Sequence, residues 1–258
     1  MKQTAASKKI APLHLTDRDF TLLQYLYDYR MMSMEQIRRY IFTNKAWPTI
    51  TNRITKLEQG DFIERLKVAS LIHPIRFTNV GTVLKITSLG IGTLANKFAS
   101  KTFSESVPDI RVQQLQHDLL LLDVVESLKT KHPKNDFVEG SRYVKGIGDQ
   151  TRVPDFVMID PKTKETTAIE LELTAKSERR YRHIILDYRM SKTFSKVLFV
   201  TASETIRRKI MTEVLGEKVH DYKIQNVGKF FFLLVSDIIR PTDPTDSCKL
   251  SVTSSLAA

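Results

Sequence analysis

The chain has 258 residues, of which 41% are hydrophobic and 27% charged, so it can bury one large core or two ordinary ones. No stretch approaches the roughly 20 apolar residues that cross a bilayer, and the sole cysteine excludes an internal disulfide and a thiolate zinc site. These features favour a globular cytoplasmic protein with no membrane partner. The formal net charge is +11, and residues 1–100 hold fifteen Lys and Arg against seven Asp and Glu. This basic N-terminal part favours a nucleic-acid partner.

Residues 13–98 have the pattern of one compact domain, preceded by a basic arm. Apolar residues at helical spacing predict helices over 15–30, 33–42 and 48–60, with Thr16 and Ser33 as N-caps and Gly60 as a stop. Segments 62–68 and 83–90 are predicted strands, and 89–98 is a closing helix. In the third helix Ile50 and Ile54 repeat on the buried side and leave a polar face outward.

This order of three helices and a two-stranded wing resembles the winged helix-turn-helix of bacterial regulators. The resemblance rests on "TITNRITKLEQGDFIERL" and on "ITSLGIGTL", which is similar to the step that closes many wings. In such folds the third helix enters the major groove of double-stranded DNA, and the wing meets phosphates. The resemblance implies base or backbone contacts from Thr49, Thr51, Asn52, Arg53 and Lys56, and phosphate contacts from Arg76 and Lys85. The alternative is that these are ordinary solvated residues on a module that packs against protein.

A polar segment, 99–111, is the predicted linker to a second domain over 112–240, and residues 241–258 have the composition of a disordered tail. The second domain is predicted to be α/β, which makes the whole chain α+β. Its predicted order is helix, three strands, helix, strand, helix and strand. The corresponding segments are 112–131, 136–146, 153–160, 166–174, 177–192, 196–202, 204–216 and 229–239.

Carboxylate side chains lie on the second and third of these predicted strands. Alternation along 166–174 places Ile169 and Leu171 on one face, and Glu170 and Glu172 on the other, roughly 7 Å apart. If Asp155 begins the adjacent strand, three carboxylates converge, and their repulsion favours a proton or a bound cation. Hard oxygen ligands of this kind suit Mg²⁺ or Mn²⁺. The alternative is that the glutamates form the solvated face of a half-exposed strand and Asp155 is a turn residue.

The element order, with Pro-Asp on one strand and Glu-Leu-Glu on the next, resembles the PD-(D/E)XK nuclease fold. Together with the N-terminal domain it resembles the replication-relaxation family of bacterial plasmids and mobile elements. The resemblance implies that Asp155 and Glu170 bind the metal, with His117 of the first helix as a candidate third ligand. The family lysine is replaced by Glu172 here. Glu172 and Lys176 are therefore the candidates for handling the proton during cleavage.

Two functions follow as hypotheses. The first is a nucleoid-associated DNA-binding protein with a metal-dependent endonuclease or nickase domain, acting in replication or transfer of a mobile element. The second is a non-catalytic DNA-binding regulator or relaxosome accessory, whose nuclease-like domain serves to form a homodimer or to dock other replication or transfer proteins. The retained Asp155 and Glu170 favour the first, and the missing lysine favours the second.

Overall fold

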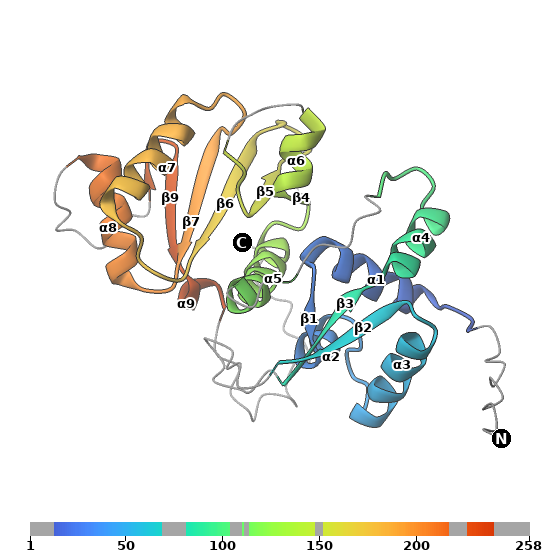
Figure 1. Ribbon diagram of the computed structural model, residues 1–258. Coiled ribbons are helices and arrows are strands. Elements are labelled where there is room, and N and C mark those ends of the chain that lie inside the picture. The colour runs from blue at the N-terminus through green and yellow to red at the C-terminus, as the bar shows by residue number, and fades with distance from the viewer. Residues whose placement is uncertain are drawn as a thin grey trace, which may run out of the picture. The chain divides into compact units, whose positions relative to one another are not determined.

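The computed structural model describes residues 13–68, 81–103, 110, 114–147, 152–216 and 226–239. The chain divides into two compact units, and the division falls between Leu122 and Asp123, inside the long helix α5 (Leu115–Lys131). The predicted linker at 99–111 therefore does not mark the division. The first half of α5, the helix labelled so in Figure 1, belongs to unit 1 and the second half to unit 2.

Unit 1 contains three helices, a small sheet and a closing helix. In chain order these are α1 (Asp17–Tyr29), β1 (Met32–Ser33), α2 (Met34–Tyr40), α3 (Trp47–Gln59), β2 (Ile63–Lys67), β3 (Thr82–Ile86) and α4 (Ser88–Lys97). The strands run antiparallel in the order β1-β3-β2. The predicted helices and both predicted strands are confirmed, whereas the two-residue strand β1 was not expected because it is too short to show alternation.

The starts of the unit 1 helices follow from local hydrogen bonds. The carboxylate of Asp19 accepts from the backbone N–H and the hydroxyl of Thr16, both at 2.6 Å, which fixes the first turn of α1. Ser33 and Gln36 form the equivalent reciprocal pair at α2. Gln36 is buried, and its side-chain amide also donates to the backbone carbonyl of Leu119 in α5, at 2.7 Å.

The first half of α5 completes the core of unit 1. Leu115 and Leu119 are buried in one cluster with Met31 and Val83. Since the α2 side chain of Gln36 holds the same stretch of α5, this part of the helix is attached to unit 1 by apolar packing and by a hydrogen bond. The core of unit 1 thus extends beyond the closing helix α4.

Unit 2 contains a six-stranded sheet in the order β4-β5-β6-β7-β9-β8. Strands β4 to β6 are antiparallel neighbours, while β6, β7 and β9 run parallel. The elements after α5 are β4 (Asp136–Glu139), α6 (Gly140–Ile147), β5 (Phe156–Ile159), β6 (Thr166–Glu172), α7 (Glu178–Met190), β7 (Lys196–Thr201), α8 (Glu204–Leu215), β8 (Asn226–Val227), β9 (Phe230–Leu234) and α9 (Val235–Ile238). The unit is mixed α/β, as predicted.

Two segments of unit 2 that were predicted as strands end in helices. The segment 136–146 was expected to be one strand, but it becomes helix α6 from Gly140 onward, because Glu139 accepts from the N–H of Arg142 at 3.0 Å and caps a helix start. The segment 229–239 likewise ends in α9, where Asp237 accepts from the N–H of Leu234 at 3.1 Å. In both places a local side-chain cap starts a helix where an extended strand was predicted.

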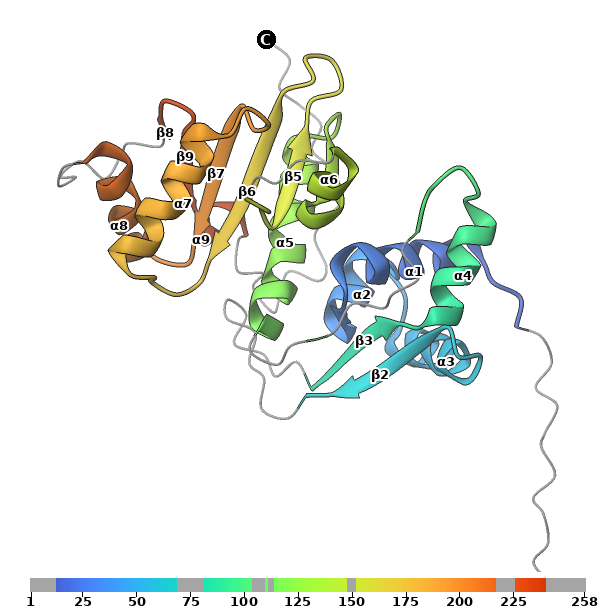
Figure 2. The same ribbon diagram turned by 45° about the horizontal axis from the view of Figure 1, so that its top comes forward.

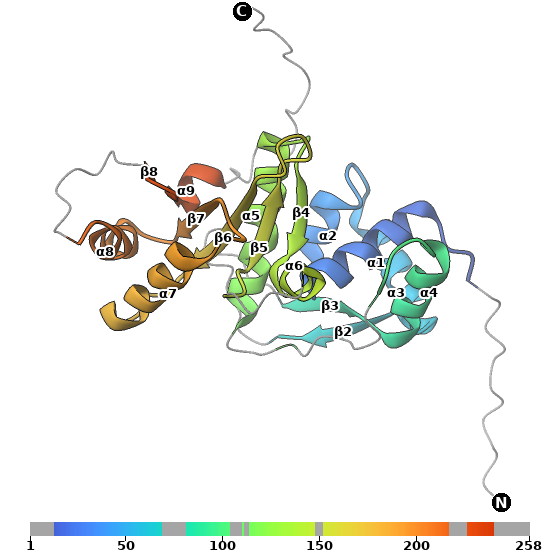
Figure 3. The same cartoon turned by 90° about the horizontal axis from the view of Figure 1, so that it is seen from above.

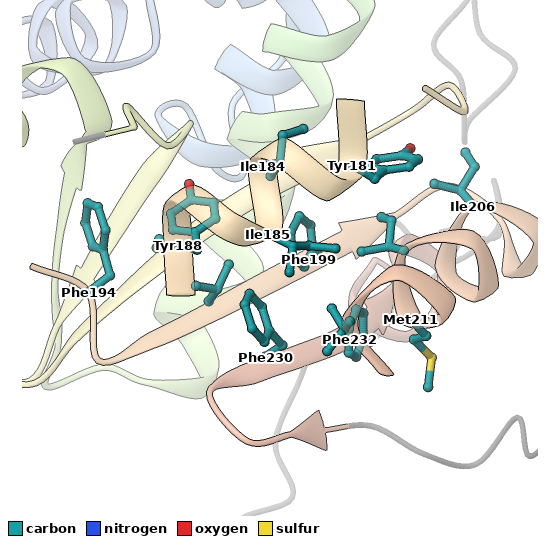
Figure 4. Packing of buried hydrophobic residues seen from close by; sticks show 14 of the residues in the cluster. Tyr181, Ile184, Ile185, Tyr188, Phe194, Phe199, Ile206, Met211, Phe230 and Phe232 are labelled. Carbon is teal, nitrogen blue, oxygen red and sulfur yellow. The ribbon is translucent and has the colours of Figure 1, made fainter. Parts of the chain in front are cut away.

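Helices α7 and α8 lie side by side over one face of this sheet (Figures 2 and 3). Figure 4 shows their apolar side chains pointing toward aromatic rings on β7 and β9. The ring of Phe199 is stacked against Phe230 and Phe232, with centroids 6.3 and 5.9 Å away, and Tyr188 meets it edge-on at 6.5 Å. Ala168 of β6 belongs to the same buried cluster, so the side of β6 that carries Glu170 and Glu172 faces α7.

Candidate functional site

The outer face of α3 carries the predicted DNA contacts. Ile50, Ile54 and Leu57 are fully buried, which turns the opposite side of the helix outward. The exposed residues on that side include Thr49, Thr51, Asn52 and Lys56. These residues therefore form one continuous polar face on a helix that is anchored by its apolar side.

Arg53 differs from its neighbours on α3. Its Nε donates to the Asp19 carboxylate at 2.8 Å, a terminal nitrogen pairs with the same carboxylate, and that nitrogen also donates to the carbonyl of His14 at 2.8 Å. Burial works against the charged form of Asp19, but hydrogen bonds from Arg53 and Thr16 outweigh it and lower the pKa of that carboxyl. Arg53 thus joins α3 to α1, a role that was not predicted, and its contact with DNA stays a prediction.

The predicted wing is described only in part. Lys85 on β3 pairs with Glu64 on β2 at 2.9 Å, and Arg76 lies outside the described residues. A neighbouring feature was missed at the sequence level: the guanidinium of Arg38 on α2 lies 5.3 Å from the ring centroid of Trp47, the exposed first residue of α3. The only sequence signal for this contact was the single tryptophan of the chain, which stands directly before a proline.

Strand β6 is buried on both faces. Only 4% of Glu170 and 2% of Glu172 are exposed. The alternative in which these glutamates form a solvated strand face is therefore wrong. A buried carboxylate needs hydrogen-bonded or charged partners, and the structure supplies one for each.

Glu170 is held by two side chains that the sequence analysis did not single out. Arg152 Nε donates to Glu170 Oε1 at 2.8 Å, and the hydroxyl of Tyr188 on α7 donates to the same oxygen at 2.5 Å. Burial raises the pKa of Glu170 and the Asp155 charge raises it further, while Arg152 and Tyr188 act in the opposite direction. Burial also raises the pKa of Tyr188, which keeps that hydroxyl a donor.

Asp155 and Glu172 complete this group, which we call the acidic cluster (Asp155, Glu170 and Glu172). Asp155 Oδ2 accepts from the backbone N–H of Leu171 at 2.8 Å. Since Leu171 lies between the two glutamates on β6, the Asp155 carboxylate lies beside this part of the strand. Burial raises the pKa of Glu172, an effect that Lys176 opposes and Asp155 adds to. The Lys176 ammonium pairs with Glu172 Oε1, so the two candidates for handling the proton lie in direct contact.

The acidic cluster does not fit a metal ion as it is placed. Its carboxylates are the hard oxygen donors that Mg²⁺ and Mn²⁺ prefer. Nevertheless, within the residues that the structure describes, no three His, Cys, Asp or Glu side chains form a group that could hold a metal. His117, the other expected ligand, lies in the first turn of α5 in the part assigned to unit 1, with its Nδ1 3.1 Å from Asp118 Oδ1.

The start of α6 fixes the backbone that carries Asp155. The N–H of Gly140 donates to the carbonyl of Asp155 at 3.2 Å, and a Cβ added at Gly140 would lie 1.8 Å from the carbonyl oxygen of Pro154. Only glycine permits this close approach of two backbones. The acidic cluster therefore depends on a glycine that is remote from it in sequence.

We expect Gly140→Ala to lower the free energy of unfolding by about 2 kcal/mol, because the new methyl group must push the Pro154 backbone away. Chemical denaturation followed by circular dichroism measures this change. Gly146→Ala on the same helix is the matched control, since nothing lies within 4 Å of its added Cβ. That variant should be unchanged or about 0.5 kcal/mol more stable. Equal destabilisation of both variants would contradict the close packing at Gly140.

In comparisons with known proteins, no family model and no curated protein sequence matches the chain. No helix among the described residues is long and apolar enough to cross a membrane.

Proposed function

We propose that the protein is a DNA-binding regulator or accessory factor whose unit 1 reads duplex DNA and whose unit 2 is a nuclease-type domain without catalysis. The outward polar face of α3, with Asn52 and Lys56 exposed on it, is the observation that supports DNA binding most directly. Amide side chains on such a helix can bond adenine edges in the major groove, and a lysine meets bases or phosphates. The basic balance of residues 1–100 supports the same partner.

The arrangement of unit 1 agrees with the winged helix-turn-helix resemblance. Helices α1, α2 and α3 precede the β2–β3 pair, and the short strand β1 adds to β3. In that fold the third helix enters the major groove. The proposed role in replication or transfer of a mobile element comes from the family resemblance and is tested separately, by the identity of the DNA that the protein retains in cells.

The non-catalytic assignment of unit 2 rests on the partners of the acidic cluster. Arg152 neutralises Glu170, Lys176 neutralises Glu172, and a backbone N–H binds Asp155. Both glutamates are nearly inaccessible to solvent. A carboxylate pair that is buried and already ion-paired is poorly placed to receive a scissile phosphate.

The second candidate is a Mg²⁺- or Mn²⁺-dependent endonuclease or nickase. It is favoured by the raised pKa of both Glu170 and Glu172, which burial causes and the charge of Asp155 increases. Such mutual perturbation among carboxylates is typical of functional sites as well as of structural ion networks. The strand order, with an antiparallel β4-β5-β6 meander and β7 parallel to β6, agrees with the PD-(D/E)XK resemblance.

DNA binding is tested first. We expect the full chain to bind duplex DNA with an affinity that falls steeply with salt, because each phosphate contact releases counterions. Lys56→Ala should weaken binding and, if Lys56 meets a phosphate, reduce the slope of log K against log salt by about 1. Asn52→Ala should lose about 1–3 kcal/mol of discrimination between sequences. Fluorescence anisotropy on a selected site and on a scrambled site measures both effects.

Lys162→Ala is the charge-matched control, since Lys162 is exposed in the turn between β5 and β6 of unit 2. Its affinity and salt slope should equal those of the wild type. If Lys162→Ala weakened DNA binding as much as Lys56→Ala does, α3 would not be part of the DNA interface.

Cleavage distinguishes the two candidates. We expect supercoiled plasmid to stay intact with the wild type in Mg²⁺ or Mn²⁺, because both glutamates are internally paired. Gel electrophoresis resolves supercoiled, nicked and linear forms. The endonuclease or nickase would instead be established if the wild type converts the plasmid to the nicked or linear form, and if Asp155→Ala and Glu170→Ala abolish this conversion but retain DNA binding. Glu172→Lys, which restores the family pattern, adds a second check: activity gained in that variant would show a nuclease site that lacks only its lysine.

A further inference from the structure

The acidic cluster already holds a cation that is supplied by the chain. Arg152 lies three residues before Asp155, which is half-buried, and the Arg152 guanidinium donates to Glu170 at 2.8 Å. The side chain of Arg152 is 25% exposed, whereas that of Glu170 is 6% exposed. The guanidinium thus stands between a buried carboxylate and solvent.

A contact with an aromatic ring also helps to hold this guanidinium. Its central carbon lies 5.7 Å from the ring centroid of Tyr188, which is the same residue that donates to Glu170. Burial alone would lower the pKa of Arg152, but the Glu170 charge more than restores it, so the arginine stays charged. Arg152 is therefore held by a carboxylate and by an aromatic face at once.

The charges of the cluster show what Arg152 does there. Among the described residues, Arg152 pairs with Glu170, and Lys176 pairs with Glu172 at the end of β6. Removing Arg152 would leave Glu170 buried beside Asp155 without the cation that it pairs with in the described residues. A buried carboxylate pair in that state takes up a proton or binds a cation.

We propose that Arg152 is the resident cation of the acidic cluster and keeps a divalent ion out of it. The cluster of Asp155 and Glu170 has the donor chemistry of a Mg²⁺ or Mn²⁺ site, and Arg152 Nε donates, at 2.8 Å, to the Glu170 oxygen that such an ion would need as a ligand. The proposal concerns unit 2 alone. Its test contains no DNA, so its failure leaves the proposed DNA-binding function untouched.

The test measures Mn²⁺ binding to the full chain at pH 8 by calorimetric titration and by thermal melting. The wild type should bind no ion at the cluster. Arg152→Met should bind about one Mn²⁺ per chain, and Mn²⁺ at about 100 times its Kd should raise Tm by about 5 °C or more. Arg152→Met combined with Glu170→Gln should lose this binding. Arg182→Met is the matched control, because Arg182 pairs with Glu213 on the surface and is not part of the cluster.

Two outcomes would overturn the proposal. One is a wild type that binds Mn²⁺ as tightly as Arg152→Met, with Glu170→Gln abolishing both. The other is a folded Arg152→Met that binds no Mn²⁺. If Arg152→Met does not fold, Arg152→Gln takes its place, since glutamine keeps an N–H donor for Glu170 without the charge. If both variants are unfolded in EDTA, recovery of the native circular dichroism in Mn²⁺ supports the proposal, and failure to recover refutes it.

Discussion

A fragment that ends at residue 103 is expected to lose about 3–6 kcal/mol of the stability of unit 1. Such a fragment keeps α1 to α4 but lacks Leu115 and Leu119, and each fully buried leucine contributes about 1.5–3 kcal/mol. It also exposes Met31 and Val83, which those leucines cover, and leaves the buried amide of Gln36 without the Leu119 carbonyl. Urea denaturation of fragments 13–103 and 13–131 measures the difference.

The longer fragment is the control, and it should unfold cooperatively and bind duplex DNA. Leu119→Ala in the full chain tests the same contact without truncation and should cost about 3 kcal/mol. If fragments 13–103 and 13–131 had equal midpoints, α5 would not belong to the core of unit 1. The practical consequence is that DNA binding by unit 1 should be measured on a fragment that includes α5.

Asp19→Ala should destabilise unit 1 by about 3 kcal/mol. Asp19 is 1% exposed, and it binds both the start of α1 and the guanidinium of Arg53. Its removal leaves Arg53 without its carboxylate, and breaking a buried ion pair from one side typically costs about 3–5 kcal/mol. The lower end applies because Arg53 is partly exposed. Thermal and urea denaturation of the full chain measure the loss.

The same helix provides the comparison. Asp17 is also acidic and also in the first turn of α1, but it is almost fully exposed and 3.6 Å from Lys97. Asp17→Ala should change the free energy of unfolding by at most about 0.5 kcal/mol. Similar losses in both variants would mean that helix-dipole effects, and not the Asp19–Arg53 pair, stabilise this helix. Arg53→Met should also be destabilising, which a solvated DNA contact would not be.

Elements with a clear periodicity could be predicted from the sequence. Helix α3 repeats its apolar residues at Ile50, Ile54 and Leu57, and β7 is a continuous apolar run. Helix α6 could not be predicted in this way, because its eight residues bury only Gly140 and Val144 and its start depends on the Glu139 cap. The division between the units was also missed, since an apolar helix such as α5 does not reveal which core each turn enters.

The sequence predicted the carboxylates of the candidate site but did not reveal the side chains that pair with them. Alternation along β6 was enough to place Glu170 and Glu172 on one side, whereas Asp155 was expected near them only on the condition that it begins the adjacent strand. The roles of Arg152 and Tyr188 depend on contacts across 18 residues of sequence, which no local pattern encodes. Arg53 was assigned to DNA by its position on α3, but its partner Asp19 is 34 residues away.

The order of the strands in unit 2 also limits how this protein can associate with others. Its sheet ends on one side at β4, a four-residue strand with an acidic residue at each end, and on the other at β8, which has two residues. An extended peptide that joins a sheet needs a long row of unpaired backbone groups along an edge strand. Among the residues that the structure describes, neither edge strand of this sheet offers one, so we expect a partner that docks on unit 2 to contact side chains on its helices and loops.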